Sequence, residues 1–439
     1  MTRAPKQELL SSVSSFNFIN MERNYNILLR TYGLQQGIYY SHSSYPRNSF
    51  SVIFLNARAP RDPGRIRETL MQLWRMYIKL QKGIVPDLDI PKKNPHHGNL
   101  SVLMGYGPKF FEIGGLKKRK PLYLNEEWLF QEPKLGGDPI LPGVGLKYAD
   151  DITSNDIGNS HFIFQFIGDT QLATNRPIIE TWKLLRKIDM NLSSAPMAMR
   201  SFFTGFNRPD GRGWLGFHDG VSNIKSSERL KSIQLDKRNL NPYDYWTASG
   251  TYMAFLRTTI DLSVWESISV SDQERIVGRE KTTGCPLIRV DNRGTNLFVR
   301  GCPVPGTSEI IERGNERFRE YRPTHIGRNV PLSNSEKSHI GRMVSVQDQI
   351  FRQGYEFLEA VDGYPYFRVG LNFISFQGGT DKIFRIIKHG FDRVNFAGDP
   401  VKVIPGTDKL LSVRGAGIFL VPPFSRGEEF PGDTVFGNF

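Results

Sequence analysis

The sequence predicts an α+β fold of two tandem ferredoxin-like domains. In the first half the apolar patterns follow the order strand, helix, strand, strand, helix, strand, which is the ferredoxin-like order. A similar order returns in the second half, although no sequence repeat of fixed period is present. The chain has 439 residues, which is enough for two domains with a sizeable core. A charged, Asn-rich stretch at 226–245 separates the halves, so we expect domains at 1–230 and 231–439.

The first half supplies four strands and two helices. The expected strands are apolar runs at 51–55, 101–106, 161–167 and 201–206. One helix opens at Pro63-Gly64 and carries its apolar face to Leu80. A second helix is expected from Ile178 to Lys187, directly after Pro177, with Trp182 on its apolar face. Residues 112–160 have little periodicity and many glycines and prolines, which predicts a long surface insertion.

The second half repeats the pattern with weaker signals. Strands are expected at 252–257, 352–357 and 370–377. Helical patterns cover 264–277 and 381–388. No further strand is predicted after the last of these helices.

Composition narrows the class of protein. The chain has 57 Lys+Arg against 44 Asp+Glu, a net charge of +13, but the densest run, Lys117–Lys120, fits a solvated loop. No aromatic RNP-type strand accompanies this charge, so a nucleic-acid partner is not expected. No apolar run is long enough to span a membrane, and the first residues lack a signal-peptide pattern. We therefore expect a cytoplasmic protein without a membrane partner.

The cysteines and most of the histidines are not candidates for catalysis or metal binding. Cys285 and Cys302 each stand in Gly-Cys-Pro without metal-ligand spacing, a local base or the numbers for a disulfide framework. His96-His97 fits an exposed loop, and His161 begins an apolar strand. None of these positions predicts a catalytic or metal site.

Two segments do carry chemistry, and the first is Gly216-Phe217-His218-Asp219-Gly220. Glycines on either side of an acid allow a flat ligand to approach the backbone closely. Apolar surroundings raise the pKa of a carboxyl group. The alternative is a plain Asp-Gly hairpin turn, which remains open on this segment alone.

The second segment contains His-Ile-Gly-Arg twice, at 325–328 and 339–342, before an arginine strand. A histidine followed by an arginine three residues later can bind a metal on one side and an anion on the other. Arg352 follows Ile350-Phe351, and an arginine inside an apolar strand requires a partner or a ligand.

Together these segments resemble the dye-decolorizing peroxidases, haem peroxidases built from two ferredoxin-like domains of the dimeric α+β barrel type. Gly-Phe-His-Asp-Gly resembles the GxxDG signature of that family. Four further segments resemble family elements in the same order: the strand from Tyr252, Val277-Gly278-Arg279, the His-Ile-x-Arg unit and Arg352-Gln353-Gly354. The strand at 370–377 also agrees, and the resemblance covers roughly residues 160–390.

The resemblance implies a haem b held against the second domain, with hydrogen peroxide and organic reductants such as dyes and phenols as substrates. Asp219 would move the peroxide proton, and Arg352 would stabilise the negative charge that grows as the O–O bond breaks. Arg342 or Arg328 would bind a haem propionate. His218 would tune the acid or touch a propionate, or be only a spacer. A homo-oligomer is compatible with the sequence.

Two histidines compete as the iron ligand. His339 lies 13 residues before Arg352 and His325 lies 27 before it, and the family spacing falls between these values. His325 matches the trailing Asn of the motif better, whereas His339 leads directly into the arginine strand. We favour His339 and keep His325 as the alternative.

The chain departs from the family at Gln353, which replaces the second arginine of the usual pair and predicts less positive charge beside Arg352. Trp74 and Trp182 are expected in the core, while Trp214 and Trp246 are candidates for a surface electron relay. Two other functions remain as alternatives: a haem- or porphyrin-binding protein of the same fold with little turnover, and a basic nucleic-acid-binding protein.

Overall fold

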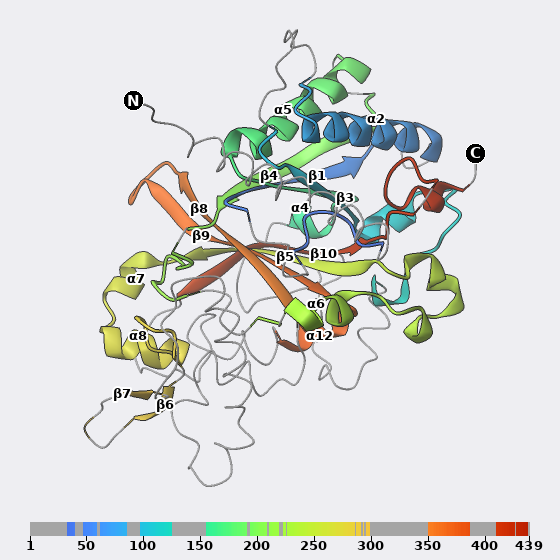
Figure 1. The fold of residues 1–439 in the computed structure, drawn as a ribbon. Coiled ribbons are helices and arrows are strands. Elements are labelled where there is room, and N and C mark those ends of the chain that lie inside the picture. Colours follow the sequence, from blue (N-terminus) through green and yellow to red (C-terminus); the bar gives the residue numbers. More distant parts are fainter. Residues whose placement is uncertain are drawn as a thin grey trace, which may run out of the picture.

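A computed structural model gives the fold of the chain (Figure 1). The structure describes residues 33–39, 47–58, 62–85, 97–124, 155–190, 194–208, 210–218, 223–224, 226–285, 287–290, 293, 296–298, 350–386, 410–425 and 427–437.

The first half forms the predicted unit with the order strand, helix, strand, strand, helix, strand. Its elements are β1 (Ser49–Ala57), α2 (Pro63–Gln81), β2 (Ser101–Tyr106), β3 (Phe162–Gly168), α5 (Gln171–Ile188) and β4 (Met197–Phe206). The strand order is β4-β1-β3-β2, so the fully buried β3 is an inner strand, as its apolar sequence predicts. Helices α2 and α5 pack together and cover one face of this half-sheet (Figure 1).

The second half forms a matching unit. Its elements are β5 (Thr251–Ile260), α7 (Leu262–Glu266), α8 (Val270–Val277), β8 (Phe351–Ala360), β9 (Phe367–Gln377), α12 (Thr380–Ile386) and β10 (Leu411–Val421). The strand order β10-β5-β9-β8 is the ferredoxin-like order again. The strand that completes this unit, β10, was not predicted, because the run Arg414-Gly415-Ala416-Gly417 interrupts its apolar pattern.

Shorter elements join these units. They are η1 (Pro108–Glu112), η2 (Leu122–Leu124), α4 (Asn155–Gly158), α6 (Ser226–Ile233), η4 (Lys237–Asn239), η5 (Pro242–Thr247), the β6 (Leu287–Val290) and β7 (Asn296–Phe298) ribbon, and η7 (Asp433–Phe436). The domain boundary expected after residue 230 falls inside α6, between the last strand of the first unit and the first strand of the second. Helices α6 and α12 contact the second half-sheet.

The two half-sheets close into one eight-stranded barrel, with the order β1-β3-β2-β10-β5-β9-β8-β4. Each seam between the halves is narrow: β2 pairs with β10 only at Tyr106 and Leu420, and β4 pairs with β8 only at Phe206 and Glu356. The predicted α+β fold of two ferredoxin-like units is therefore confirmed, and the units share a barrel interior.

Aromatic and aliphatic side chains fill that interior from both halves. Phe50 of β1 stacks on Tyr355 of β8, with the ring centroids 4.6 Å apart. Phe54 of β1 meets Phe255 of β5 edge to face at 5.2 Å. Because these contacts join the halves through the interior, the narrow seams do not leave the units independent.

A short peptide, residues 33–39, enters the barrel beside these side chains. The Gln35 amide donates to the carbonyl oxygens of Met104 at 2.9 Å and Pro422 at 2.8 Å, and its Oε1 accepts from the Met104 N–H at 2.8 Å. Gln165 and Gln353 each donate to the Gly37 carbonyl oxygen at 3.1 Å. This peptide therefore links β2, β3 and β8 with the residue that follows β10.

Helix α5 differs from its prediction. It begins at Gln171, seven residues before the expected Ile178, and Pro177 lies inside it rather than before it. The Thr170 side chain caps the helix by accepting from the Ala173 N–H at 3.2 Å. The predicted apolar face was also wrong at Trp182, which is 44% exposed. A full helical turn can precede a proline, so the position of Pro177 did not mark the first residue of α5.

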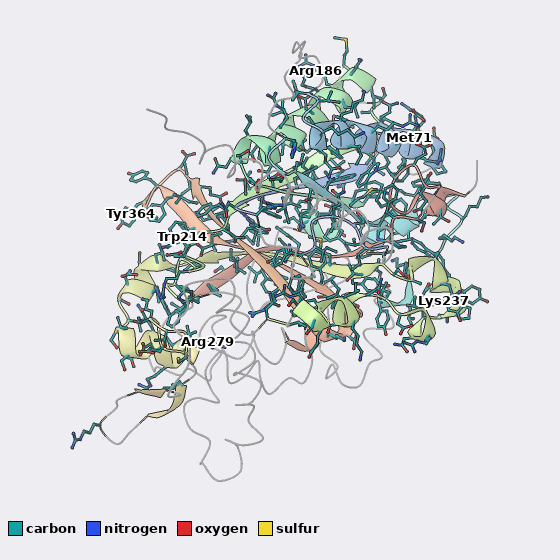
Figure 2. The ribbon with its side chains drawn as sticks, viewed as in Figure 1. Met71, Arg186, Trp214, Lys237, Arg279 and Tyr364 are labelled. Carbon is teal, nitrogen blue, oxygen red and sulfur yellow. The ribbon has the colours of Figure 1, made fainter. Side chains whose placement is uncertain are left out.

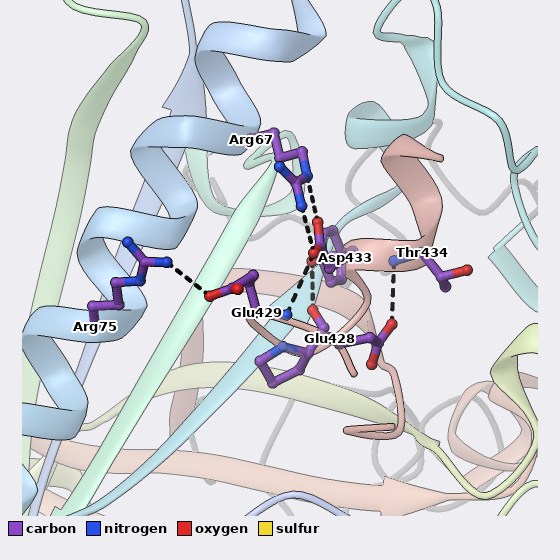
Figure 3. Close-up of polar contacts among 8 residues, drawn as sticks. Arg67, Arg75, Glu428, Glu429, Asp433 and Thr434 are labelled. Carbon is purple, nitrogen blue, oxygen red and sulfur yellow. Dashed lines mark hydrogen bonds and ion pairs between the residues drawn. The ribbon is translucent and has the colours of Figure 1, made fainter. Parts of the chain in front are cut away.

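The segment 427–437 is fastened to α2 by charged groups (Figure 3). Arg67 makes two bonds to the Asp433 carboxylate, at 2.7 Å and 2.8 Å, and Arg75 pairs with Glu429 at 2.9 Å. Glu428 accepts from the Thr434 N–H at 3.1 Å, although burial raises the pKa of this carboxyl group. The two-bond Arg67–Asp433 pair is half-buried, which makes it the strongest of these contacts.

Candidate functional site

The loop that carries the Gly-Phe-His-Asp-Gly segment is a tight hairpin over residues 210–218. The Gly213 N–H donates to the Phe217 carbonyl at 3.0 Å, and the Gly216 N–H donates to the Gly213 carbonyl at 2.8 Å. Gly216 has a φ of +84°, and a Cβ there would lie 2.5 Å from the Cε of Lys281. Only glycine fits this turn without strain. Asp219 itself lies outside the described residues.

Arg212 joins this hairpin to the segment after α8. Its guanidinium donates to the Gly216 carbonyl at 2.7 Å, the Lys281 carbonyl at 2.6 Å and the Thr282 carbonyl at 2.7 Å. Two of these charge-assisted bonds hold the hairpin against the second unit, and the third closes the hairpin itself.

Trp214 anchors the same hairpin on β8. Its indole N–H donates to the Phe357 carbonyl at 3.1 Å, and its backbone N–H donates to Oε1 of Glu356. Figure 2 shows Trp214 beside β8 and β9. The side chain is half-buried, as is that of Trp246, the other candidate for an electron relay.

The chain returns to β8 on the far side of the acid. Asn223 accepts from the Arg352 N–H at 3.0 Å and donates to the Arg352 carbonyl at 2.7 Å. Asp219 therefore lies, in the sequence, between two segments that are both hydrogen-bonded to the strand of Arg352. This is the link between acid and arginine that the sequence analysis did not foresee.

Arg352 lies on the outer face of β8, away from the barrel interior. Its neighbours on either side in the chain, Phe351 and Gln353, are fully buried, whereas Arg352 is partly exposed. Across the sheet it pairs with Ser375 of β9, which pairs with Ala254 of β5. Its side chain thus lies on a face with small neighbours.

Gln353 does not lower the positive charge beside Arg352, contrary to the prediction. Successive side chains of a strand point to opposite faces, so residue 353 points into the barrel. There Gln353 donates to Gly37, and its Oε1 accepts from the Tyr39 N–H at 3.4 Å. The replacement of arginine by glutamine at this position changes the barrel interior.

A second arginine lies close enough to Arg352 to affect its surroundings. Burial, followed by the positive charge of Arg352, lowers the pKa of Arg279 to about 9. Arg279 follows Gly278, the left-handed residue that ends α8, and donates to the Gly284 carbonyl at 2.7 Å (Figure 2). The Gly278-Arg279 pair was noticed in the sequence, but nothing there gave it a place beside Arg352.

His218 is 8% exposed, and among the described residues neither ring nitrogen has a hydrogen-bond partner. Burial, followed by the charge of Arg212, lowers the pKa of His218, while Asp210 opposes the shift. The neutral imidazole is therefore favoured, and it leaves one N–H and one lone pair without a partner from this part of the chain. Such buried polar atoms usually mark a missing partner.

The remaining predicted site residues, His325, Arg328, His339 and Arg342, lie outside the described residues, as does Cys302. Cys285 is buried and disulfide-bonded. A low cysteine count argues against a framework of bridges and does not exclude a single one. Within the described ranges, no three His, Cys, Asp or Glu side chains gather as a metal site.

His161 has a structural effect that depends on pH. Burial, followed by the charge of Lys109, lowers its pKa from 6.5 to about 4. Between these values the unfolded chain binds a proton that the folded protein does not bind, so acid favours unfolding. We expect the free energy of unfolding to fall by about 1 kcal/mol per pH unit from 6.5 to 4, with no contribution above 6.5.

Urea unfolding at pH 7.5 and 4.5 checks this expectation. A His161→Gln variant has no proton to bind, so its stability should decline less between the two pH values than that of the wild type. Equal declines in both proteins would show that His161 does not contribute to acid sensitivity.

None of the helices within the described ranges has the length and apolar character needed to cross a membrane.

The barrel consists of two ferredoxin-like units, and the hairpin at 210–218 is bonded to the strand of Arg352. Comparisons with known proteins identify the class of protein to which this arrangement belongs. Residues 210–426 match the model of the family described as Dyp-type peroxidase, C-terminal. A dye-decolorizing peroxidase of Brevibacterium linens is 36% identical over 125 residues, which cover 28% of this chain and 33% of that protein. The chain spans about a third of the length of the first curated relatives that it matches.

Solved structures agree in fold. A DyP-type peroxidase from Cellulomonas bogoriensis has a TM-score of 0.62 at 20% identity, covering 90% of this chain and 94% of that chain. A DypB variant from Rhodococcus jostii, in complex with heme, has a TM-score of 0.52 at 16% identity, covering 86% and 94%. The chain belongs to the Dyp-type peroxidase family.

Proposed function

We propose that this chain is a haem b peroxidase that uses hydrogen peroxide to oxidise organic reductants such as dyes and phenols. The observation that carries the proposal is the attachment of both flanks of the Asp219 segment to β8, the strand of Arg352. A carboxylate and a guanidinium are the two groups that heterolysis of a peroxide bond requires.

The residues on this face suit a haem. Arg352, Ser375, Ala254 and Ile418 form one row across β8, β9, β5 and β10, because each pairs with the next. Small and apolar side chains in such a row allow a flat apolar ring to approach closely. The unpartnered ring nitrogens of His218 offer a donor to an anionic substituent of that ring.

The residues of the chain would divide the work as follows. A bound haem supplies the iron at which peroxide reacts. Asp219 would accept one proton from hydrogen peroxide and return it to the departing oxygen, which would leave as water. The guanidinium of Arg352 remains charged and stabilises the negative charge that develops on that oxygen.

Two further residues would hold the cofactor. His339, or alternatively His325, is proposed as the iron ligand, as a neutral imidazole. Arg342 or Arg328 would pair with a propionate. These assignments rest on the motif resemblance and on the family to which the chain belongs.

Absorbance and turnover of the purified protein test the proposal. After haem is added, we expect a Soret band together with peroxide-dependent bleaching of an anthraquinone dye. A Soret band without bleaching would favour a porphyrin-binding protein, and a colourless protein would contradict haem binding altogether.

The same spectrum distinguishes the two histidines. We expect the native Soret band to be lost in His339→Ala and kept in His325→Ala. The reverse result would assign the ligand to His325.

A further inference from the structure

Both ends of the Asn223 carboxamide bond to one backbone position of β8, and its Oδ1 also accepts from the Ile224 N–H at 3.1 Å. Its Oδ1 accepts from the Arg352 N–H at 3.0 Å, and its Nδ2 donates to the Arg352 carbonyl at 2.7 Å. This is the pair of bonds that a neighbouring strand would make in an antiparallel ladder.

The position of this pair explains why a side chain is needed there. β4 pairs with β8 only at Glu356, and its last residue, Phe206, makes that pair. The earlier residues of β8 therefore extend past the end of β4, while β9 pairs on the opposite edge. At Arg352 the amide of Asn223 takes the place of the absent strand partner.

Asn223 is itself held by its neighbours. The Ile224 carbonyl accepts from Nε of Arg229 at 2.8 Å, and Ile224 is buried. The Arg229 guanidinium lies 4.9 Å from the centre of the Phe351 ring, one residue before Arg352. The segment that carries Asn223 is thus attached to β8 at two consecutive residues.

We propose that Asn223 is a positioning residue that sets the direction of the Arg352 side chain. This inference rests on the proposed peroxidase function. Both bonds hold the backbone dihedral angles at Arg352, and these determine where a long side chain can reach.

Loss of the amide should act on the peroxide step alone. In Asn223→Ala we expect the second-order rate constant for peroxide to fall by about ten- to hundredfold, since a small misplacement of a charge-stabilising group has effects of that size. The Soret band and the KM for the reductant should remain at the wild-type values. Asn223→Asp keeps the acceptor for the Arg352 N–H and should show a smaller loss.

A double-mutant cycle separates positioning from a general structural effect. If Asn223 acts through Arg352, then Asn223→Ala should have no further effect on the peroxide rate in an Arg352→Ala background. Additive losses would overturn the proposal. Asn241→Ala is the matched control, because it also removes an amide that accepts from a backbone N–H, at 3.1 Å from Tyr243, and it should leave the peroxide rate unchanged.

Hydrogen exchange tests the contact without turnover. The Arg352 amide proton should be protected in the wild type and should exchange faster in Asn223→Ala, with the protection of other β8 amides kept. Equal exchange in the two proteins would overturn the inference even if the enzyme is active. Faster exchange in a protein that shows no peroxidase turnover would contradict the proposed function and leave the contact itself established.

Discussion

Replacing Arg352 with leucine is expected to lower the second-order rate constant for hydrogen peroxide by about 100- to 1,000-fold. The guanidinium is the positively charged group on the outer face of β8, and leucine cannot stabilise the negative charge of a departing oxygen. Removal of one preorganised donor from a catalytic site has an effect of this size. The change is measured by stopped-flow absorbance under single-turnover conditions, with haem content determined on the same samples.

Two further variants make this result specific. Arg352→Lys keeps a positive charge but loses the planar, forked set of donors, so its rate constant should lie between those of the wild type and the leucine variant. Arg368→Leu removes an exposed arginine of β9 that pairs with Glu359 at 3.2 Å, and it should leave the rate unchanged. A leucine variant at position 352 with wild-type kinetics would remove Arg352 from the mechanism.

Replacing Gln35 with leucine is expected to lower the free energy of unfolding by about 3–6 kcal/mol. Leucine has a similar size but leaves the Met104 N–H and the carbonyls of Met104 and Pro422 without their partner inside the barrel. Each buried polar group that loses its hydrogen bond costs about 1–3 kcal/mol, although relaxation of the peptide recovers part of this. Urea unfolding followed by circular dichroism gives the difference.

A glutamine on the surface provides the comparison. Gln72 of α2 bonds only to Glu68, at 2.9 Å in an exposed position, and Gln72→Leu should change stability by less than about 0.5 kcal/mol. Similar midpoints for the two leucine variants would show that residues 33–39 do not hold the barrel together.

Part of the fold was predictable because some of its strands are almost entirely apolar. The pattern at 161–167 and 370–377 leaves little choice, since each run is too short for a buried helix and is flanked by glycine. The last strand was missed where two glycines and an arginine interrupt the pattern. Closure of the barrel depends on single residue pairs at Tyr106 and Phe206, which no periodicity reveals.

The residue types of the candidate site were predictable from the sequence. The contacts between those residues were less predictable. A motif shows that Arg352 and the acid occur together in the sequence, but it does not show which face of β8 each side chain takes. For that reason Gln353 was misjudged, and Asn223 and Arg279 were given no role. Their contacts join positions more than 70 residues apart in the sequence, where local patterns carry no information.

One residue of the β4–β8 seam has two partners that belong to different parts of the molecule. The backbone of Glu356 makes the only strand pair between β4 and β8, and its carboxylate receives the N–H of Trp214 from the hairpin at 210–218. Opening the barrel at this edge would therefore remove one attachment of that hairpin, while its bonds to Phe357 and to the segment after α8 remain. Local loosening of the hairpin on heating should therefore begin below the melting temperature of the barrel.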